Sequence, residues 1–260
     1  MDQETGREGS SPPNLPVITL LTDFGTADYF VGAVKGAILS VNPNVVIVDI
    51  THEIPAQDIE AGAFMLLAAY KTFPRGTIHV AVVDPGVGSS RRPIIVTANE
   101  QFFVGPDNGL FTYIYDREPA HRTFHVTAEK YFRSDPSSTF HGRDIFAPVA
   151  GALSAGVPLQ QFGPEINDEI RLPSLETPLR IIHIDHFGNC VTNIQRDEFP
   201  GGSLSINGQT ISRLRNFYGE ASPEEIFAIW GSAGFLEISV NGGSAAQLLR
   251  AKRGDPISVT

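Results

Sequence analysis

From residue 17 onward, short apolar runs rich in β-branched residues alternate with stretches of helical periodicity. This alternation is typical of strands joined by crossover helices, and it predicts an α/β domain with a mostly parallel sheet. Strands are predicted over residues 17–22, 45–50, 77–83 and 93–98. Helices are predicted over residues 27–40, 57–73 and 141–155, where apolar residues recur at helical spacing.

The composition changes after residues 163–178, which are acidic, rich in proline and without sustained periodicity. Beyond them, short apolar runs at residues 179–184, 203–206, 226–230 and 235–240, separated by Gly, Asn and Ser, predict a small antiparallel sheet or barrel. We therefore expect four parts: a disordered leader over residues 1–16, an N-terminal α/β domain over 17–162, a linker over 163–178, and a smaller C-terminal antiparallel β domain over 179–260.

The charge balance argues against two classes of partner. Nineteen Lys and Arg face 29 Asp and Glu, which gives a net charge of -10, and the basic residues do not cluster as a nucleic-acid binder requires. The longest near-apolar run, residues 61–70, is about half of what a membrane-spanning helix needs. We expect neither nucleic acid nor a membrane as partner, and a small cationic ligand fits the charge better.

A single cysteine, Cys190, cannot form an intramolecular disulfide, and no Cys and His residues have the spacing of zinc ligands. The first 16 residues are polar and acidic, whereas a secretory signal is basic and then apolar. These features predict a cytoplasmic protein.

Five clusters of polar and glycine residues follow the apolar runs, at residues 20–30, 82–93, 103–111, 139–148 and 184–194. In open α/β sheets, ligands bind outside the carboxyl ends of the strands, where such clusters lie. The common phosphate-binding, nucleophile-elbow and zinc motifs are absent. A two-metal phosphoesterase site is one alternative. It would use Asp23, His52, Asp84, Asp107, His141 and Asp144.

Taken together, the clusters resemble the S-adenosyl-L-methionine (SAM) hydrolase family, also called SAM hydroxide adenosyltransferases, which is related to the SAM-dependent fluorinase and chlorinase. The motifs that carry the resemblance are Thr22-Asp23-Phe24-Gly25, Asp84-Pro85-Gly86-Val87-Gly88 with Arg91, Gly105-Pro106-Asp107-Asn108-Gly109, Phe140-His141-Gly142-Arg143-Asp144 and Asp185-His186-Phe187-Gly188-Asn189. The resemblance implies an α/β domain followed by a β domain, and a homotrimer with each SAM site between two subunits.

The resemblance also implies three catalytic residues, Asp84, Arg91 and His141. Arg91 would orient Asp84, and either Asp84 or His141 would polarise the attacking water and take its proton. SAM carries a sulfonium at ribose C5′, so methionine leaves as a neutral thioether and needs no general acid. The expected reaction is hydrolysis of SAM to adenosine and L-methionine by in-line attack of water, with no metal and no organic cofactor.

Five residues match the family's substrate-binding positions. Asp23 would accept hydrogen bonds from the ribose hydroxyls. Asp185 would pair with the methionine α-ammonium, and Ser232 would bind the polar groups of the same moiety. Phe187 would pack on the adenine, and Asn189 would hydrogen-bond its edge.

Two alternatives share the resemblance: a SAM halogenase that makes 5′-halo-5′-deoxyadenosine, and a non-catalytic protein that binds adenosine or SAM. Asp84 disfavours the halogenase, because the halogenating relatives carry no carboxylate there and a negative charge about 4 Å from a halide opposes its binding. The catalytic residues disfavour the non-catalytic protein. Ala233 departs from some relatives, which carry an arginine beside the serine.

Overall fold

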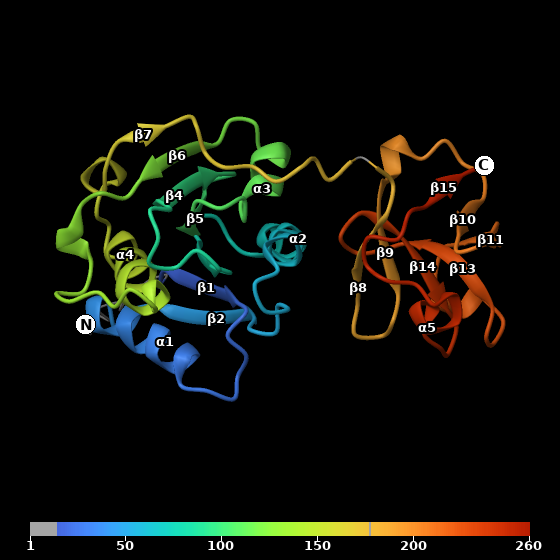
Figure 1. Ribbon diagram of the computed structural model, residues 1–260, viewed down its shortest axis with the longest axis horizontal. Helices are drawn as coiled ribbons and strands as arrows, with labels where there is room; N and C mark the ends of the chain where they lie inside the picture. Colours follow the sequence, from blue (N-terminus) through green and yellow to red (C-terminus); the bar gives the residue numbers. More distant parts are fainter. Residues whose placement is uncertain (1–14, 177) are drawn as a thin grey trace, which may run out of the picture.

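The computed structural model describes residues 15–176 and 178–260, so residues 1–14 of the predicted leader lie outside the described part of the chain. It comprises two lobes, one on each side of a single connecting segment (Figure 1). The N-terminal lobe holds a seven-stranded sheet in the order β2-β1-β3-β5-β4-β6-β7. Its strands are β1 (Val17–Thr22), β2 (Val46–Thr51), β3 (Ile78–Val82), β4 (Pro93–Ala98), β5 (Gln101–Pro106), β6 (Arg122–His125) and β7 (Glu165–Ile166).

The sheet confirms the predicted α/β class. Strands β2, β1, β3 and β5 pair in parallel, while β4, β6 and β7 are added with antiparallel pairing. The predicted bounds of β1 and β4 are confirmed. Strand β2 begins and ends one residue later than predicted, and β3 is one residue shorter than predicted at each end. Strands β5, β6 and β7 were not predicted.

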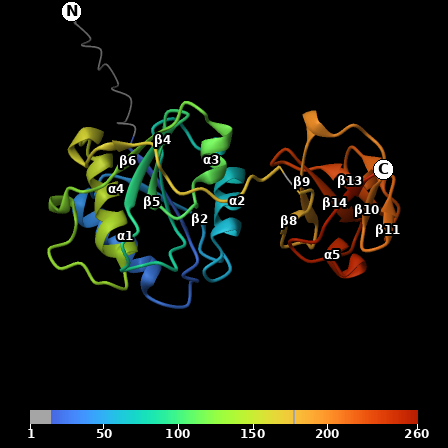
Figure 2. The same ribbon diagram turned by 45° about the horizontal axis from the view of Figure 1, so that its top comes forward.

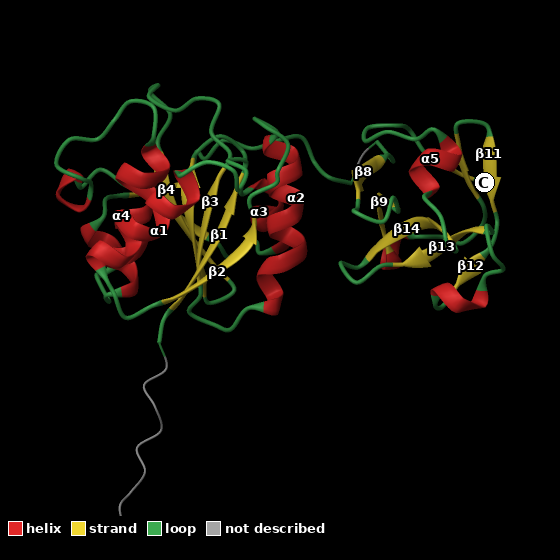
Figure 3. Cartoon of the chain, turned by 90° about the horizontal axis from the view of Figure 1, so that it is seen from below, coloured by secondary structure: helices red, strands yellow, loops and turns green. Residues whose placement is uncertain are grey.

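Helices cover both faces of this sheet, with α1 and α4 on one side and α2 and α3 on the other (Figure 3). Their bounds are α1 (Phe30–Val41), α2 (Ile59–Ala69), α3 (Thr112–Arg117) and α4 (Ala147–Ser154), with a π-helix, η3 (Gly142–Phe146), before α4 and 3-10 turns η1 (Tyr70–Thr72), η2 (Glu129–Tyr131) and η4 (Leu159–Gln161). Alternate residues of β3 serve the two layers: Val80 packs toward α1 and α4, and Ala81 packs toward α2. Burial on both faces explains why β3 is apolar except for His79.

The C-terminal lobe confirms the predicted sheets of mainly antiparallel strands. A five-stranded sheet has the order β12-β13-β14-β9-β8, and a three-stranded sheet has the order β11-β10-β15. Figure 2 shows β8, β9, β13 and β14 of the first sheet and β10 and β11 of the second. The elements are β8 (Ile181–Ile184), β9 (Cys190–Gln195), η5 (Arg196–Glu198), β10 (Leu204–Ile206), β11 (Gln209–Ile211), β12 (Leu214–Arg215), η6 (Tyr218–Glu220), β13 (Ile226–Trp230), β14 (Phe235–Val240), α5 (Ala245–Leu249) and β15 (Ser258–Val259). Along β14, Leu236 and Ile238 enter the core of this lobe, while Phe235 and Glu237 occupy the opposite face.

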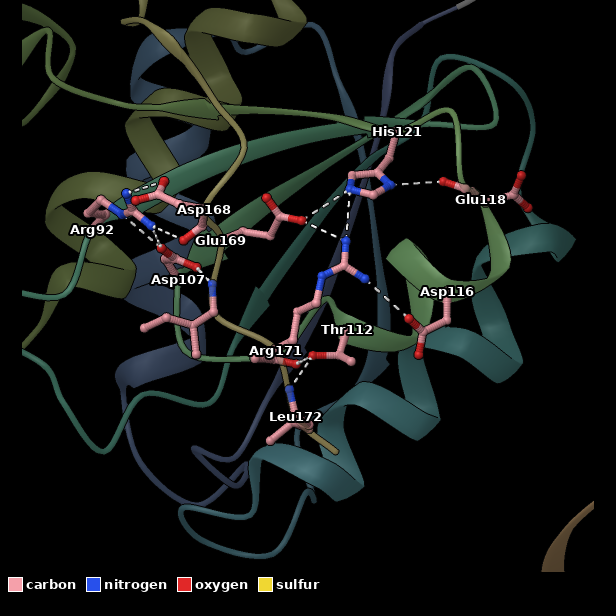
Figure 4. A network of polar contacts seen from close by, with 12 residues as sticks. Arg92, Asp107, Thr112, Asp116, Glu118, His121, Asp168, Glu169, Arg171 and Leu172 are labelled. Atoms are coloured by element: carbon pink, nitrogen blue, oxygen red, sulfur yellow. Dashed lines mark hydrogen bonds and ion pairs between the residues drawn. The ribbon is translucent and has the colours of Figure 1, made fainter. Parts of the chain in front are cut away.

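The segment predicted as a linker is fastened to the N-terminal lobe (Figure 4). Buried Asp107 accepts hydrogen bonds from Arg92 (2.8 Å) and from the backbone N–H of Ile170 (2.8 Å). Further on, the hydroxyl of Thr112 accepts from the backbone N–H of Leu172 (2.8 Å). Asp107, which the motif placed in a glycine-rich turn, therefore holds the connecting segment.

Helix α2 also contacts the C-terminal lobe. The ring of Phe64 lies 5.2 Å from that of His183 and 5.8 Å from that of Phe235, and Arg180 donates a 2.8 Å hydrogen bond to Glu60. No helix among the described residues is long and apolar enough to cross a membrane.

Candidate active site

Two predicted site residues lie at one edge of the sheet because β1 and β3 run in parallel. Asp23 follows β1 directly, and Asp84 follows β3 after one further residue. Both carboxylates line a hollow of about 250 Å³ at the carboxyl ends of these strands. Gln57 and His141 line the same hollow. We call it the sheet-edge hollow.

Asp84, Arg91 and His141 form one hydrogen-bonded unit on the wall of this hollow. Arg91 Nε lies 3.0 Å from each carboxylate oxygen of Asp84, and Arg91 Nη2 lies 2.5 Å from Oδ2. The same Nη2 lies 2.8 Å from Nδ1 of His141. The side chains of Arg91 and Asp84 are only 7% and 5% exposed, so their charges interact with little screening from water.

The contact with Arg91 fixes the protonation of His141. A guanidinium has only donors, so Nδ1 must be the acceptor, and the neutral ring then carries its proton on Nε2. Burial lowers the pKa of His141, and the neighbouring Arg91 charge lowers it further, against the opposing influence of Asp84 and Asp144. The imidazole is therefore neutral at physiological pH and presents an N–H donor from Nε2.

A close backbone approach positions His141. Gly88 has φ +78°, and a Cβ at this position would lie 2.2 Å from the carbonyl oxygen of Ser138. Only glycine therefore allows the loop after β3 to touch the loop that leads to His141. Below the unit, the Arg91 guanidinium lies 5.0 Å from the ring centroid of Phe146, which supports the cation on an apolar face.

Polar contacts of Asp144 shape the start of the helix beyond His141. The fully buried carboxylate of Asp144 accepts from Arg143 Nε (2.7 Å) and from the backbone N–H of Ser137 (2.9 Å). The helix predicted over residues 141–155 is a π-helix over Gly142–Phe146 and an α-helix over Ala147–Ser154.

The turn that carries Asp23 is held from two sides. In front, Asp23 Oδ2 accepts a 2.8 Å hydrogen bond from the backbone N–H of Gln57, whose φ is +66°. Behind it, the hydroxyl of Thr22 lies 2.8 Å from Nδ1 of buried His52, and the His52 carbonyl accepts from the N–H of Gly25 at 2.8 Å. His52 is thus part of the frame of the turn.

The C-terminal lobe places Asp185, Phe187 and Asn189 in the turn between β8 and β9. Asp185 Oδ1 accepts from the backbone N–H groups of Phe187 (2.9 Å) and Asn189 (2.8 Å), and Oδ2 accepts from Asn189 Nδ2 (2.8 Å). Among the described residues, the Asn189 amide oxygen has no hydrogen-bond partner, and Phe187 is 75% exposed. Ser232 lies exposed in the turn between β13 and β14.

A second hollow, of about 590 Å³, lies in this lobe, and we call it the β-lobe hollow. Phe187, Asn189 and Tyr218 contribute to its walls together with residues 240–243. Among the described residues, the two hollows share no lining residue. The predicted site residues therefore form two groups, one in each lobe.

The structure shows contacts around the site that the sequence did not indicate. Gly88, Phe146 and Tyr218 each contact a predicted site residue or line a hollow. Gly88 stood in a motif, but its contact with Ser138 depends on a loop 50 residues later. Phe146 looked like an ordinary core position of the predicted helix, and Tyr218 gave no signal in the sequence.

The six residues of the two-metal alternative do not form one cluster in the structure. Asp107 and Asp144 are occupied by arginines in separate parts of the lobe. In the described part of the chain, no group of three or more His, Cys, Asp or Glu residues is arranged to hold a metal ion.

Comparisons with known proteins cover nearly the whole chain. Residues 18–163 match the model of the SAM hydroxide adenosyltransferase N-terminal domain, and residues 179–258 match that of the C-terminal domain. An (R)-S-adenosyl-L-methionine hydrolase from Salinispora tropica is 38% identical over 261 residues, which cover 94% of this chain and 98% of that protein. A fluorinase from Nocardia brasiliensis is 27% identical over 292 residues, covering 94% and 96%.

A solved structure is similar over the same extent. The crystal structure of an uncharacterized conserved protein from Thermotoga maritima has a TM-score of 0.88 and 34% sequence identity, and the match covers 94% of this chain and all of that one. Both lobes are thus part of the similarity.

Proposed function

The chain belongs to the SAM hydroxide adenosyltransferase family, and on that premise we propose how it hydrolyses S-adenosyl-L-methionine to adenosine and L-methionine. A water molecule attacks ribose C5′ in line with the C5′–S bond. The new O–C5′ bond forms as the C5′–S bond breaks, and the sulfur departs with the bonding electrons as the neutral thioether of methionine. The water loses one proton in the process.

The main support for this proposal is that Asp84, Arg91 and His141 form one hydrogen-bonded unit on the wall of the sheet-edge hollow. A water held there would accept a hydrogen bond from His141 Nε2–H and donate one to the Asp84 carboxylate. The lone pair on His141 Nδ1 is already engaged by Arg91, so the ring has no free acceptor. We therefore assign the proton to Asp84, and His141 orients the water as a donor.

Asp23 fits the ribose end of the substrate. It lines the same hollow, and of its two carboxylate oxygens only Oδ2 accepts a hydrogen bond from the described residues. The carboxylate can therefore accept from the 2′- and 3′-hydroxyls, as acidic residues do at the ends of strands in dinucleotide sites. With the ribose held there, C5′ would face the Asp84 side of the hollow, and binding would align water and carbon.

The adenine and the methionine belong to the C-terminal lobe in this proposal. Phe187 offers an exposed aromatic face for the adenine, and the amide oxygen of Asn189 can accept from its amino group. Asp185 and Ser232 would hold the polar end of methionine. Since Ala233 provides no cation, the methionine carboxylate would rest on Ser232 or on backbone N–H groups.

We also propose a homotrimer in which the sheet-edge hollow of one subunit faces the β-lobe hollow of the next. The separation of the two residue groups within one chain supports this arrangement.

A cytoplasmic location is proposed from the single cysteine. Cys190 is buried, burial raises the pKa of its thiol to about 12, and it has no part in the chemistry.

Purified protein mixed with SAM tests the function, with adenosine and methionine followed by chromatography. We expect both products in equal amounts, above the rate of spontaneous breakdown, and independent of added chloride or fluoride. A halide-dependent 5′-halo-5′-deoxyadenosine would favour the halogenase. Tight retention of SAM without turnover would favour a binding protein.

A further inference from the structure

Glu237 is a half-buried carboxylate that the proposed chemistry leaves without a role. It projects from β14 on the face that also bears Phe235, away from the core of its lobe. Among the described residues, no Lys, Arg or His lies within ion-pair distance of its oxygens. Carboxylates withdrawn from water are normally paired with a cation, so this position points to a missing partner.

The backbone holds this carboxylate in a defined place. A Cβ on Gly231 would lie 1.7 Å from Glu237 Oε1 and 2.9 Å from its Cγ, so the side chain lies against the residue that precedes Ser232. The turn is closed by a 2.9 Å hydrogen bond from the N–H of Gly231 to the carbonyl of Phe235. Glu237 therefore underlies the turn that carries Ser232.

A second unpaired carboxylate lies nearby. Burial raises the pKa of Glu237, and the charge of Asp185 raises it further. The Tyr218 hydroxyl lies 3.5 Å from Asn189 Nδ2, and it lies close to Glu237 as well. Asp185 likewise has no Lys, Arg or His within ion-pair distance among the described residues. Glu237 thus lies against the turn that carries Ser232, Asp185 lies close enough for its charge to act on Glu237, and Ala233 adds no cation.

Resting on the function proposed above, we infer that Glu237 is a specificity residue, which together with Asp185 forms the subsite for the α-ammonium group of the substrate. A primary ammonium has three donors, and two carboxylates and a hydroxyl can accept all of them. Binding of the cation also removes the repulsion between the acids. The subsite selects sulfonium substrates that carry an amino group, and it does not contribute to bond breaking at C5′.

The test compares SAM with an analogue in which hydrogen replaces the α-amino group, using the full-length enzyme. We expect Glu237→Gln to raise KM for SAM on the order of 10-fold, with kcat within about twofold, and to leave KM for the analogue unchanged. Glu237→Asp, which keeps the charge, should retain more of the preference for SAM than Glu237→Gln. Glu198→Gln, on an exposed carboxylate elsewhere in this lobe, is the matched control.

An equal effect of Glu237→Gln on both substrates, or no effect on either, would overturn the assignment. Thermal denaturation of each variant accompanies the kinetics. Because the glutamine removes repulsion, it should melt no lower than the wild-type protein. If the wild-type protein hydrolyses neither substrate, the proposed function fails instead, so the two failures are distinguishable.

Discussion

Removing the guanidinium of Arg91 tests whether Arg91 and Asp84 behave as a buried ion pair. In the Arg91→Met variant, Asp84 would lose its cation, while both positions stay shielded from water. Breaking a buried pair in this way costs about 3–5 kcal/mol of unfolding free energy. With about 2–4 °C of melting temperature per kcal/mol in domains of this size, the expected loss is roughly 6–20 °C.

Two controls define the origin of that loss. Arg75 and Glu100 also form an ion pair, at 2.7 Å, but their side chains are 84% and 63% exposed, so Arg75→Met should cost less than about 1 kcal/mol. The double variant Asp84→Asn/Arg91→Met removes the stranded charge and should be more stable than Arg91→Met alone. Urea denaturation followed by circular dichroism gives all four free energies. If Arg91→Met lies within about 1 kcal/mol of the wild-type protein, the reasoning from burial is wrong.

Three further outcomes follow from the same structure. Asp84→Ala and His141→Ala should each lower kcat by about 10²–10⁴-fold while KM for SAM changes far less, and steady-state kinetics would contradict their roles if KM carried the effect. Gly88→Ala should cost at least about 1–3 kcal/mol and reduce kcat, since its Cβ would collide with the carbonyl of Ser138; a fully active, equally stable variant would argue against this contact. Burial lowers the pKa of His79 from 6.5 to about 4, so the unfolded chain binds a proton before the folded protein does as the pH falls. About 3 kcal/mol of unfolding free energy, fully present above pH 6.5, is therefore lost between pH 6.5 and 4. In urea denaturation at a series of pH values, His79→Gln should make the unfolding free energy depend less on pH in this range.

Local sequence patterns were sufficient for about half of the strands in the described part of the chain. Runs such as Val17–Thr22 and Ile226–Trp230 are mostly apolar and rich in β-branched or aromatic residues, so their bounds could be predicted. Strand β9 (Cys190–Gln195) was missed because Thr192 and Asn193 interrupt its apolar pattern. Both are buried, and the Asn193 amide bonds to the carbonyls of Leu175 and Pro178, which no local pattern reveals.

The candidate site was predictable where its residues are close in sequence or belong to a motif. Asp84 and Arg91 are seven residues apart, and the structure joins them directly. The tautomer of His141 could not be predicted from the sequence, because it depends on a contact with Arg91, which is 50 residues away along the chain. The position of Glu237 could not be predicted either, because the sequence does not show whether an acidic residue in a strand has a cation nearby in the folded protein.

The most direct test of the account is the fate of a labelled water molecule. In water enriched in oxygen-18, the purified protein should convert SAM to adenosine that carries the label in its 5′-hydroxyl, while the methionine stays unlabelled in mass spectrometry. That pattern requires attack of water at C5′ with departure of sulfur. Unlabelled adenosine, or label found in methionine, would contradict attack of water at C5′.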